Sequence, residues 1–328
     1  MQVLLDNKLN FYKASLHGHS TYSDGKFSVE ELKEMFKAKG YSVVAFSDHE
    51  HLIDNSNLDD ENFLTITSAE MAIKEFPTQS TLVNHNMRVA HLNFYALDQH
   101  NTLTPCYSSV YDHYRNSDIV KSKIRFDKEY ERVYNADGIN DMIKIASENG
   151  FLVQYNHPTW SLENATDYVH YKGLWSIEVF NTSVQLSGGE SYVPNAFDDL
   201  LRLGNKVYAT MCDDNHSLDS MFGGFVMINA DKLDYKTIMT ALQNGNFYSS
   251  QGPEIISLVK DGNKVKIKTS GVKQIAMSTY GRKCKSVNAK DGVPVTEAEF
   301  ELIPEFEFFR ITLTDFEGNH ALTNAYKV

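Results

Sequence analysis

Short, continuous apolar runs alternate with segments of helical periodicity from residue 14 to about residue 250. The runs predict strands over 14–17, 41–46, 63–67, 90–96, 151–155, 174–180 and 206–211. The segments between them predict helices over 28–39, 137–148, 195–203 and 235–243. Such alternation is typical of parallel βα units. Polar residues come directly after several of these runs. Polar side chains are found in the same position at the active-site end of a barrel. The pattern therefore favours an α/β fold with a distorted (β/α)7-type barrel over an open doubly wound sheet.

The helix expected over 28–39 carries its own boundary signals. Ser28 stands at the N-cap and Glu31 completes a capping box, in which each side chain binds the backbone N–H of the other residue. Gly40 follows the last periodic residue and stops the helix. The chain then enters the apolar run at 41–46.

The pattern changes after about residue 252. Runs at 255–259, 264–269, 274–278, 300–303 and 308–315 are short and are joined by turn residues such as Asp261-Gly262. They predict a small antiparallel β domain over 253–328, following a larger unit over 1–252. Residues 99–135 are polar, aromatic and weakly periodic, which indicates a long insertion in the larger unit.

Composition restricts the class of protein and of partner. The 328 residues are 42% hydrophobic, which predicts a folded core. A net charge of −12 argues against a nucleic-acid polymer or an acidic membrane as partner. A small anionic substrate stays open, because bound cations reverse the field locally. Three unpaired cysteines, with no signal-like or membrane-spanning run, predict a cytoplasmic protein without membrane contact, and its oligomeric state is left open.

Candidate chemistry begins with His17-Gly18-His19. On an extended chain, residues i and i+2 face the same side, so both imidazoles could chelate one ion. Taken alone, the pair fits exposed histidines better. Asp24 taken alone fits a turn or a helix cap. His49 ends an apolar run, where a buried imidazole needs a metal or a carboxylate as partner.

Further polar residues accompany the later runs. Glu70 comes shortly after a predicted strand, where a solvated loop carboxylate is the alternative. His91 lies inside an apolar run, so a hydrogen-bonded core histidine competes with a metal ligand, and His85 is a rival for the ligand role. His157 is followed by a proline that fixes the chain beside it, which strengthens the metal interpretation.

Asp214 and His216 complete the series after the last predicted strand of the larger unit. Each signal is modest, but six histidines and three acids fall at or near the ends of successive predicted strands. Together they indicate a metal cluster, and a set of N and O donors without thiolate suits Mn, Fe or Zn. We expect the neighbouring Asp213, Glu50 and His51 to support the ligands or to face solvent.

The segments LHGHSTYSDG, AFSDHEH, SAEM, AHLNF, YNHP and CDDNH carry these residues. In their order and spacing the sequence resembles the polymerase and histidinol phosphatase (PHP) family over roughly residues 12–250. The stretch LQNGNFYSSQGP and the β-rich tail resemble the branch with carbamate-hydrolase-like members. The resemblance implies a metal-dependent hydrolase of the amidohydrolase type with two or three divalent ions.

The resemblance also implies three groups of ligands. The first ion would be held by His17, His19, Glu70 and Asp214. The second would share the Glu70 carboxylate, with His91 and His157. The third would be held by Asp24, His49 and His216. Of these residues, the ones expected to act in catalysis as well are Glu70, Asp214 and His216. Glu178, at another strand end, is expected to orient a ligand histidine.

The expected function is phosphoester hydrolysis of a small metabolite by a hydroxide that two or three metal ions activate. Asp214 would orient this nucleophile or carry its proton. Lys121, Lys123 and Arg125 in the insertion are candidates for binding the anion, although a solvated charge run explains each of them equally simply. The alternative keeps the metals but cleaves an amide, a carbamate or a carboxylic ester. A non-catalytic metal-binding module is disfavoured, because every ligand position is filled.

Overall fold

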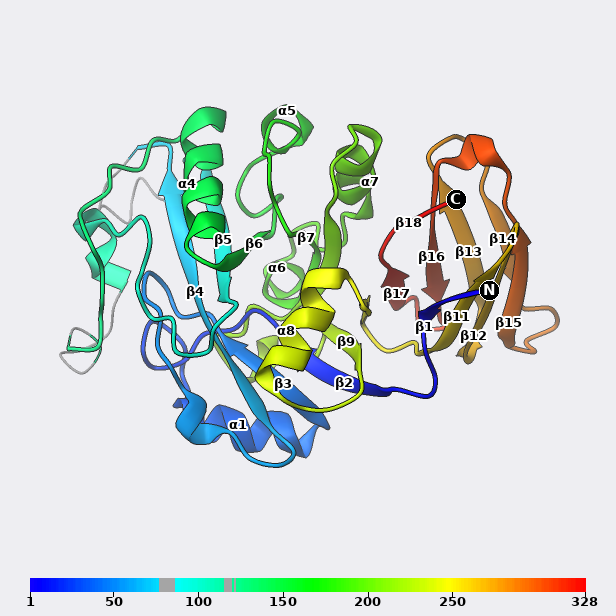
Figure 1. The fold of residues 1–328 in the computed structure, drawn as a ribbon, viewed down its shortest axis with the longest axis horizontal. Coiled ribbons are helices and arrows are strands. Elements are labelled where there is room, and N and C mark those ends of the chain that lie inside the picture. The colour runs from blue at the N-terminus through cyan, green and yellow to red at the C-terminus, as the bar shows by residue number, and fades with distance from the viewer. Residues whose placement is uncertain (77–85, 115–119, 121) are drawn as a thin grey trace.

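One continuous series of hydrogen-bonded strands runs through the molecule in the computed structural model, which describes residues 1–76, 86–114, 120 and 122–328 (Figure 1). The part that carries the polar strand ends has the order β2 (Asn10–Ser15), β3 (Tyr41–Phe46), β4 (Leu64–Lys74), β5 (Val89–Ala96), β6 (Phe151–Tyr155), β7 (Ser176–Asn181) and β8 (Tyr208–Cys212). Strands β2 to β4 are parallel, and so are β6 to β8. Strand β5 is antiparallel to both of its neighbours, so the expected parallel arrangement is wrong there.

Strand β4 is longer than predicted. The sequence indicated an end at residue 67, but the chain stays extended to Lys74 because residues 68–74 pair with β5, from Ser68 opposite Tyr95 to Lys74 opposite Val89. Glu70 therefore lies within a strand and not after one. Every residue of β4 is buried, including the polar ones such as Thr65, Thr67 and Glu70.

Two strands that the sequence did not predict continue the sheet beyond β2. They are β9 (Phe225–Ala230) and β10 (Phe247–Ser250), both antiparallel to their neighbours. Within the described residues no ladder joins β8 to β9. The predicted mixed α/β class is confirmed, while closure of the strands into a barrel stays a prediction.

The four predicted helices are present as α1 (Val29–Ala38), α4 (Ala136–Glu148), α7 (Pro194–Arg202) and α8 (Tyr235–Asn244). The capping box of α1 is confirmed, with Ser28 and Glu31 each accepting from the backbone N–H of the other. In Figure 1, α4 and α7 lie in the upper part of the view and α1 in the lower part. Short helices are α5 (Ala165–Tyr168) and α6 (Thr182–Leu186), with 3-10 turns at Ser56–Leu58, Ser109–Tyr114, Leu218–Ser220 and Pro304–Phe306. None of the helices in the described part of the chain has the length and hydropathy that a bilayer crossing needs.

Helix α4 shows how a helix is fixed on the sheet. Ile139, Met142 and Ile143 follow the spacing of one helix face and are buried. They belong to the same core cluster as Phe151 and Val153 of β6. Burying such side chains stabilises the fold by about 1.5–3 kcal/mol each, which holds the sheet rigid beneath the polar strand ends.

The remaining strands form two facing antiparallel sheets, on the right in Figure 1. One contains β1 (Gln2–Leu5), β11 (Ile255–Asp261), β12 (Lys264–Val272) and β15 (Val295–Glu301). The other contains β13 (Gln274–Thr279), β14 (Lys285–Asn288), β16 (Phe308–Thr314), β17 (His320–Thr323) and β18 (Tyr326–Lys327).

The two sheets enclose a common core that includes Leu258, Ile267, Ile275, Phe309 and Ile311. Strand β15 begins well before the predicted run at 300–303 and ends at Glu301. Pairing of β1 with β11 was not predicted. Strand β17 pairs with β10 and so joins these strands to the rest of the sheet. The domain boundary at residue 252 stays a prediction.

Candidate metal centre

The two histidines of the first motif lie just beyond the end of β2, and both are buried. The backbone of Gly18 between them packs against Asn215, so closely that a Cβ on Gly18 would stand 2.1 Å from Oδ1 of Asn215. Glycine is therefore needed to bring His17 and His19 to the turn that carries Asp214. This contact joins the first and last motifs of the sequence in space.

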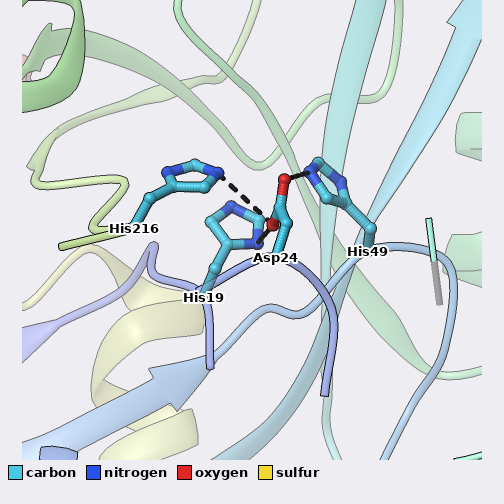
Figure 2. Close-up of side chains that lie close together, drawn as sticks. All are labelled: His19, Asp24, His49 and His216. Atoms are coloured by element: carbon cyan, nitrogen blue, oxygen red, sulfur yellow. Dashed lines mark ion pairs between the residues drawn. The ribbon is translucent and has the colours of Figure 1, made fainter. Parts of the chain in front are cut away.

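One group of side chains lies around Asp24 (Figure 2). Its Oδ1 atom is 3.4 Å from Nε2 of His216 and 3.8 Å from Nδ1 of His19. Its Oδ2 atom is 3.6 Å from Nε2 of His49. Asp24 and His216 are the more exposed members, with side chains 47% and 37% exposed, so this group faces the solvent side of the site.

A second, fully buried group consists of His17, His19, Glu70 and Asp214. The Oδ1 atom of Asp214 is 2.9 Å from Nε2 of His19 and 3.3 Å from Nε2 of His17. The carboxylate of Glu70 reaches the same two nitrogens, at 3.2 Å from His17 and 3.4 Å from His19. His19 also belongs to the group around Asp24, so the two groups are contiguous.

The third group consists of Glu70, His91 and His157. The Oε1 atom of Glu70 is 3.0 Å from Nδ1 of His91 and 3.2 Å from Nε2 of His157. The structure thus brings all nine candidate ligands together, and in each group one ligand atom per residue lies within 4.8 Å of the others. The rival His85 lies outside the described residues.

The donor chemistry of these groups fits divalent metal ions. The Nε2 atom of His17 is buried and makes no hydrogen bond to any described residue, although Oε1 of Glu70 stands 3.2 Å away. Such an atom is costly to leave without a partner, and a cation between the imidazole and the carboxylate satisfies both. The nitrogen and oxygen donors match Mn, Fe and Zn.

The histidines hold the buried carboxylates in their charged form. Burial alone raises the pKa of Glu70, but the charges of His91 and His17 outweigh burial and hold this pKa well below its ordinary value. Burial alone would also raise the pKa of Asp214. The charge of His17 and the hydrogen bond from His19 outweigh burial, so this pKa lies well below its ordinary value. Both carboxylates are therefore anions, which is the form that binds cations.

Glu178 fixes the orientation of His17, as the sequence predicted. Its Oε1 atom lies 3.0 Å from Nδ1 of His17. Its Oε2 atom accepts from the backbone N–H of His157 and from Nδ2 of Asn181, each at 2.9 Å. A carboxylate behind an imidazole sets the tautomer and the direction of the ligand nitrogen.

Asp48 organises the loop that carries His19 and Asp24. Its carboxylate accepts from both the backbone N–H and the hydroxyl group of Ser20 and of Ser23, at 2.7–3.1 Å. Sequence reasoning gave this residue no role, because an Asp beside a ligand histidine reads equally well as a turn residue. The two serines, Ser20 and Ser23, are the only local sequence signal for this hydrogen-bonded loop.

Asp213 performs a similar task on the opposite side of the site. It accepts from the backbone N–H groups of Phe222, Gly223 and Gly224 at 2.7–2.9 Å and from the hydroxyl of Thr182 at 2.7 Å. Asp213, Glu50 and His51 are all buried, so of the two expectations for them the solvent-facing position is wrong, while support of the ligands stays a prediction.

Asn156 is a further contact that the sequence did not reveal. Its Nδ2 atom donates to Oε1 of Glu70 at 2.7 Å and to Asn93 at 3.0 Å.

Backbone strain is present at two of the candidate ligands, since His157 and Asp214 have positive φ values of 23° and 55°. Residues other than glycine rarely adopt this region, and they do so mainly at functional sites.

Seven of the nine candidate ligands line a cavity of about 480 Å³, and His17 and His19 are not part of its lining. Lys74 is the one lysine or arginine among the described residues that line it. Lys123 instead lies 5.3 Å above the ring of Tyr22, and Lys121 falls outside the described residues. Neither Lys123 nor Arg125 lines the cavity.

Residues 15–192 match the model of the PHP domain. The chain belongs to the PHP family. The family membership that the motifs predicted is confirmed, and the matched residues include the ligand candidates from His17 to His157. The PHP match ends before Asp214 and His216, which the structure brings to the same cluster.

Known proteins are similar to this PHP protein over different shares of its length. A segment of 84 residues is 34% identical to the DNA polymerase/3'-5' exonuclease PolX of Bacillus subtilis, and it spans 20% of this chain and 15% of that protein. A two-domain protein of Bacteroides vulgatus, described as containing a predicted PHP-like metal-dependent phosphoesterase, is 14% identical, with a TM-score of 0.48 over 99% of this chain and 96% of that one. An amidohydrolase of Chromobacterium violaceum with bound sulfate is 14% identical, with a TM-score of 0.39 over 71% of this chain and 96% of that one.

Proposed function

We propose that this PHP protein is a metal-dependent phosphoesterase that hydrolyses a small phosphorylated molecule. One observation carries the proposal: the carboxylate of Glu70 stands 3.0–3.4 Å from nitrogen atoms of five histidines. A carboxylate in this position can bridge two ions, one on the side of His17 and His19 and one on the side of His91 and His157.

Two or three bound divalent ions, Mn, Fe or Zn, would supply a Lewis acid and a water of lowered pKa to this site. Glu70 would hold two of them together, and Asp24, His49 and His216 would provide for a third. Neutralisation of a phosphate by these ions explains how a chain with a net charge of −12 binds an anion.

The residues of the site divide the remaining work by position. Asp214 directs Oδ1 toward His17 and His19 and Oδ2 toward Asn181, at 3.3 Å, so it is held from both sides. We assign to Asp214 the orientation of the attacking water or the transfer of its proton. His216, at the exposed edge of the cavity, would hold the third ion together with Asp24 and His49, and we assign it a catalytic role as such a ligand.

The size of the cavity supports a small substrate. A volume of about 480 Å³ lies within the range of roughly 300–1,000 Å³ that is usual for metabolite sites. The distorted (β/α)7-type barrel and the division into residues 1–252 and 253–328 remain part of this proposal. A barrel would place the three ligand groups at one end of its strands.

Hydrolysis of an amide, carbamate or carboxylic ester is the second candidate. The observation that favours it is the scarcity of cations, since Lys74 is the one lysine or arginine in the described lining. A neutral carbonyl substrate needs fewer such residues than a phosphate does, and the same metal ions polarise a carbonyl group.

A hydrolysis panel on manganese-reconstituted protein separates the two candidates. The panel contains a phosphomonoester, a phosphodiester and a carboxylic ester or carbamate, all with the same chromophore. Each compound is assayed with wild type, with Asp214→Asn and with Asp219→Asn, an exposed position that serves as matched control. Phosphoester turnover that is lost in Asp214→Asn and kept in Asp219→Asn is the expected result. Turnover of the carbonyl compound alone would replace the proposal by the second candidate.

A further inference from the structure

Besides the candidate ligands, the lining of the cavity contains side chains of two chemical kinds. Hydroxyl groups come from Ser183, Ser187, Ser217 and Ser220. Apolar side chains come from Met87, Val89, Trp160, Val184 and Leu186, and we call this set the tryptophan wall. The hydration needs of a metal cluster account for the hydroxyl groups but not for the apolar side chains.

Trp160 is the largest member of the tryptophan wall and is not a core residue. It is 49% exposed, whereas the other tryptophan, Trp175, is 7% exposed and donates its indole N–H to the carbonyl of Leu242 at 2.9 Å. Leu186 on the same wall is 57% exposed. Exposed apolar side chains gathered in a cavity mark a binding surface more often than a packing accident.

The position of Trp160 relates it directly to the candidate reaction centre. Its ring centroid lies 5.2 Å from that of His91 and 4.9 Å from that of His157. Both histidines contact Oε1 of Glu70. A group attached to the reacting phosphoryl or carbonyl centre therefore lies within reach of the indole ring.

We propose that the tryptophan wall selects substrates whose leaving group is planar and apolar, and that Trp160 stacks on this group. The inference rests on the proposed phosphoester hydrolysis and names its substrate class, the phosphomonoesters of aromatic or aryl-methyl alcohols. Trp160 is a specificity-determining residue, because it touches the leaving group and not the reacting atoms. Stacking with burial of one ring predicts a preference of about tenfold over an aliphatic leaving group.

The test compares two phosphates whose alcohols have similar acidity, so that a difference in leaving-group reactivity does not mask a difference in binding of the leaving group. Values of kcat/KM for benzyl phosphate and propyl phosphate are measured with manganese-reconstituted wild type, Trp160→Ala and Trp160→Phe. Phe316→Ala is the control, because Phe316 is aromatic, also 49% exposed and outside the cavity lining. Calorimetric titration with benzylphosphonate and propylphosphonate adds a binding readout, and the metal content of each sample is measured.

The expected result is a benzyl preference in wild type that falls severalfold in Trp160→Ala, is largely restored in Trp160→Phe and is unchanged in Phe316→Ala. The same order is expected for the two phosphonates. Hydrolysis of both phosphates without preference, or a preference that Trp160→Ala retains, would overturn the inference and leave the phosphoesterase proposal standing. Hydrolysis of neither phosphate with binding of neither phosphonate would overturn both.

Discussion

Arg132 and Glu50 form a buried, two-point ion pair. Nη1 of Arg132 lies 2.9 Å from Oε1 of Glu50, and Nη2 lies 2.6 Å from Oε2. The arginine also donates to the backbone carbonyls of Cys106 and Ala72. It therefore connects Cys106 to β4 and to the residue next to His49, beside the candidate metal centre.

Replacement of this arginine is expected to destabilise the whole protein. Arg132→Met removes the guanidinium group that contacts both oxygens of the buried Glu50 carboxylate, and we expect the free energy of unfolding to fall by about 3–5 kcal/mol. Urea unfolding measures the loss. The control is Arg88→Met, since Arg88 pairs with Glu75 and Asp167 but is 43% exposed, and its loss should cost at most about 1 kcal/mol. Equal losses in both variants would contradict the importance of the buried pair.

Glu70→Gln tests the proposed bridge. The substitution keeps the shape of the side chain but removes its negative charge, so we expect lower metal content and lower hydrolytic rate together. Elemental analysis after dialysis and steady-state assays measure the two effects. Glu75→Gln is the matched control, because it changes the same residue type near the surface, beside Arg88. Normal metal content and rate in Glu70→Gln would remove Glu70 from the proposed ligand set.

Glu178→Gln tests the support of His17. In wild type both carboxylate oxygens accept: Oε1 faces His17, while Oε2 accepts from the His157 N–H and from Asn181. A glutamine has an amide NH₂ group in place of one of these two oxygens. In either orientation of the amide, this group faces a donor on His17 or the donors of His157 and Asn181. We expect metal affinity or activity to fall by about 10–100-fold, measured by metal titration and assay. The exposed Glu190→Gln should leave both unchanged, and an equally silent Glu178→Gln would argue against the orienting role.

Glu163 gives a prediction about pH. Burial raises the pKa of this carboxyl group, although hydroxyl groups of Tyr134, Tyr155 and Tyr171 donate to it and lower its pKa in part. The folded pKa therefore lies above the unfolded one. The contribution of Glu163 to stability is complete below the unfolded value near 4.5 and is lost as pH rises through the folded pKa.

Comparison of wild type with Glu163→Gln isolates this titration, because the other groups cancel in the difference. The amide does not titrate, so the variant should gain stability relative to wild type as pH rises above about 4.5. Urea unfolding at a series of pH values measures the difference. A difference that is constant, or that changes in the opposite direction, would contradict the raised pKa.

The parts of the fold that were predictable depend on local signals. Helix α1 begins and ends where Ser28, Glu31 and Gly40 indicate, because capping and a left-handed turn are decided within a few residues. The end of β4 was mispredicted because residues 68–74 owe their extended form to β5, which is a partner distant in sequence. The antiparallel direction of β5 likewise depends on pairing and not on local pattern.

The candidate site divides in the same way. Side chains such as His17 and Asp214 could be grouped from sequence, because strand ends converge at one edge of a parallel sheet and the motifs are spaced accordingly. The roles of Asp48 and Arg132 could not, because each is defined by hydrogen bonds to backbone groups whose positions exist only in the folded chain. No sequence signal marked Trp160 either, since the exposure of its side chain is decided only in the folded protein.

Strand β1 pairs with β11, with Gln2 opposite Lys260. During synthesis the ribosome releases β1 long before its partner exists, so these residues must wait while the strands around the metal ligands form. Pairing of β1 with β11 then joins two stretches of chain that lie far apart in the sequence. Deletion of residues 2–5 would expose one edge of β11, and a protein shortened in this way should associate through that edge.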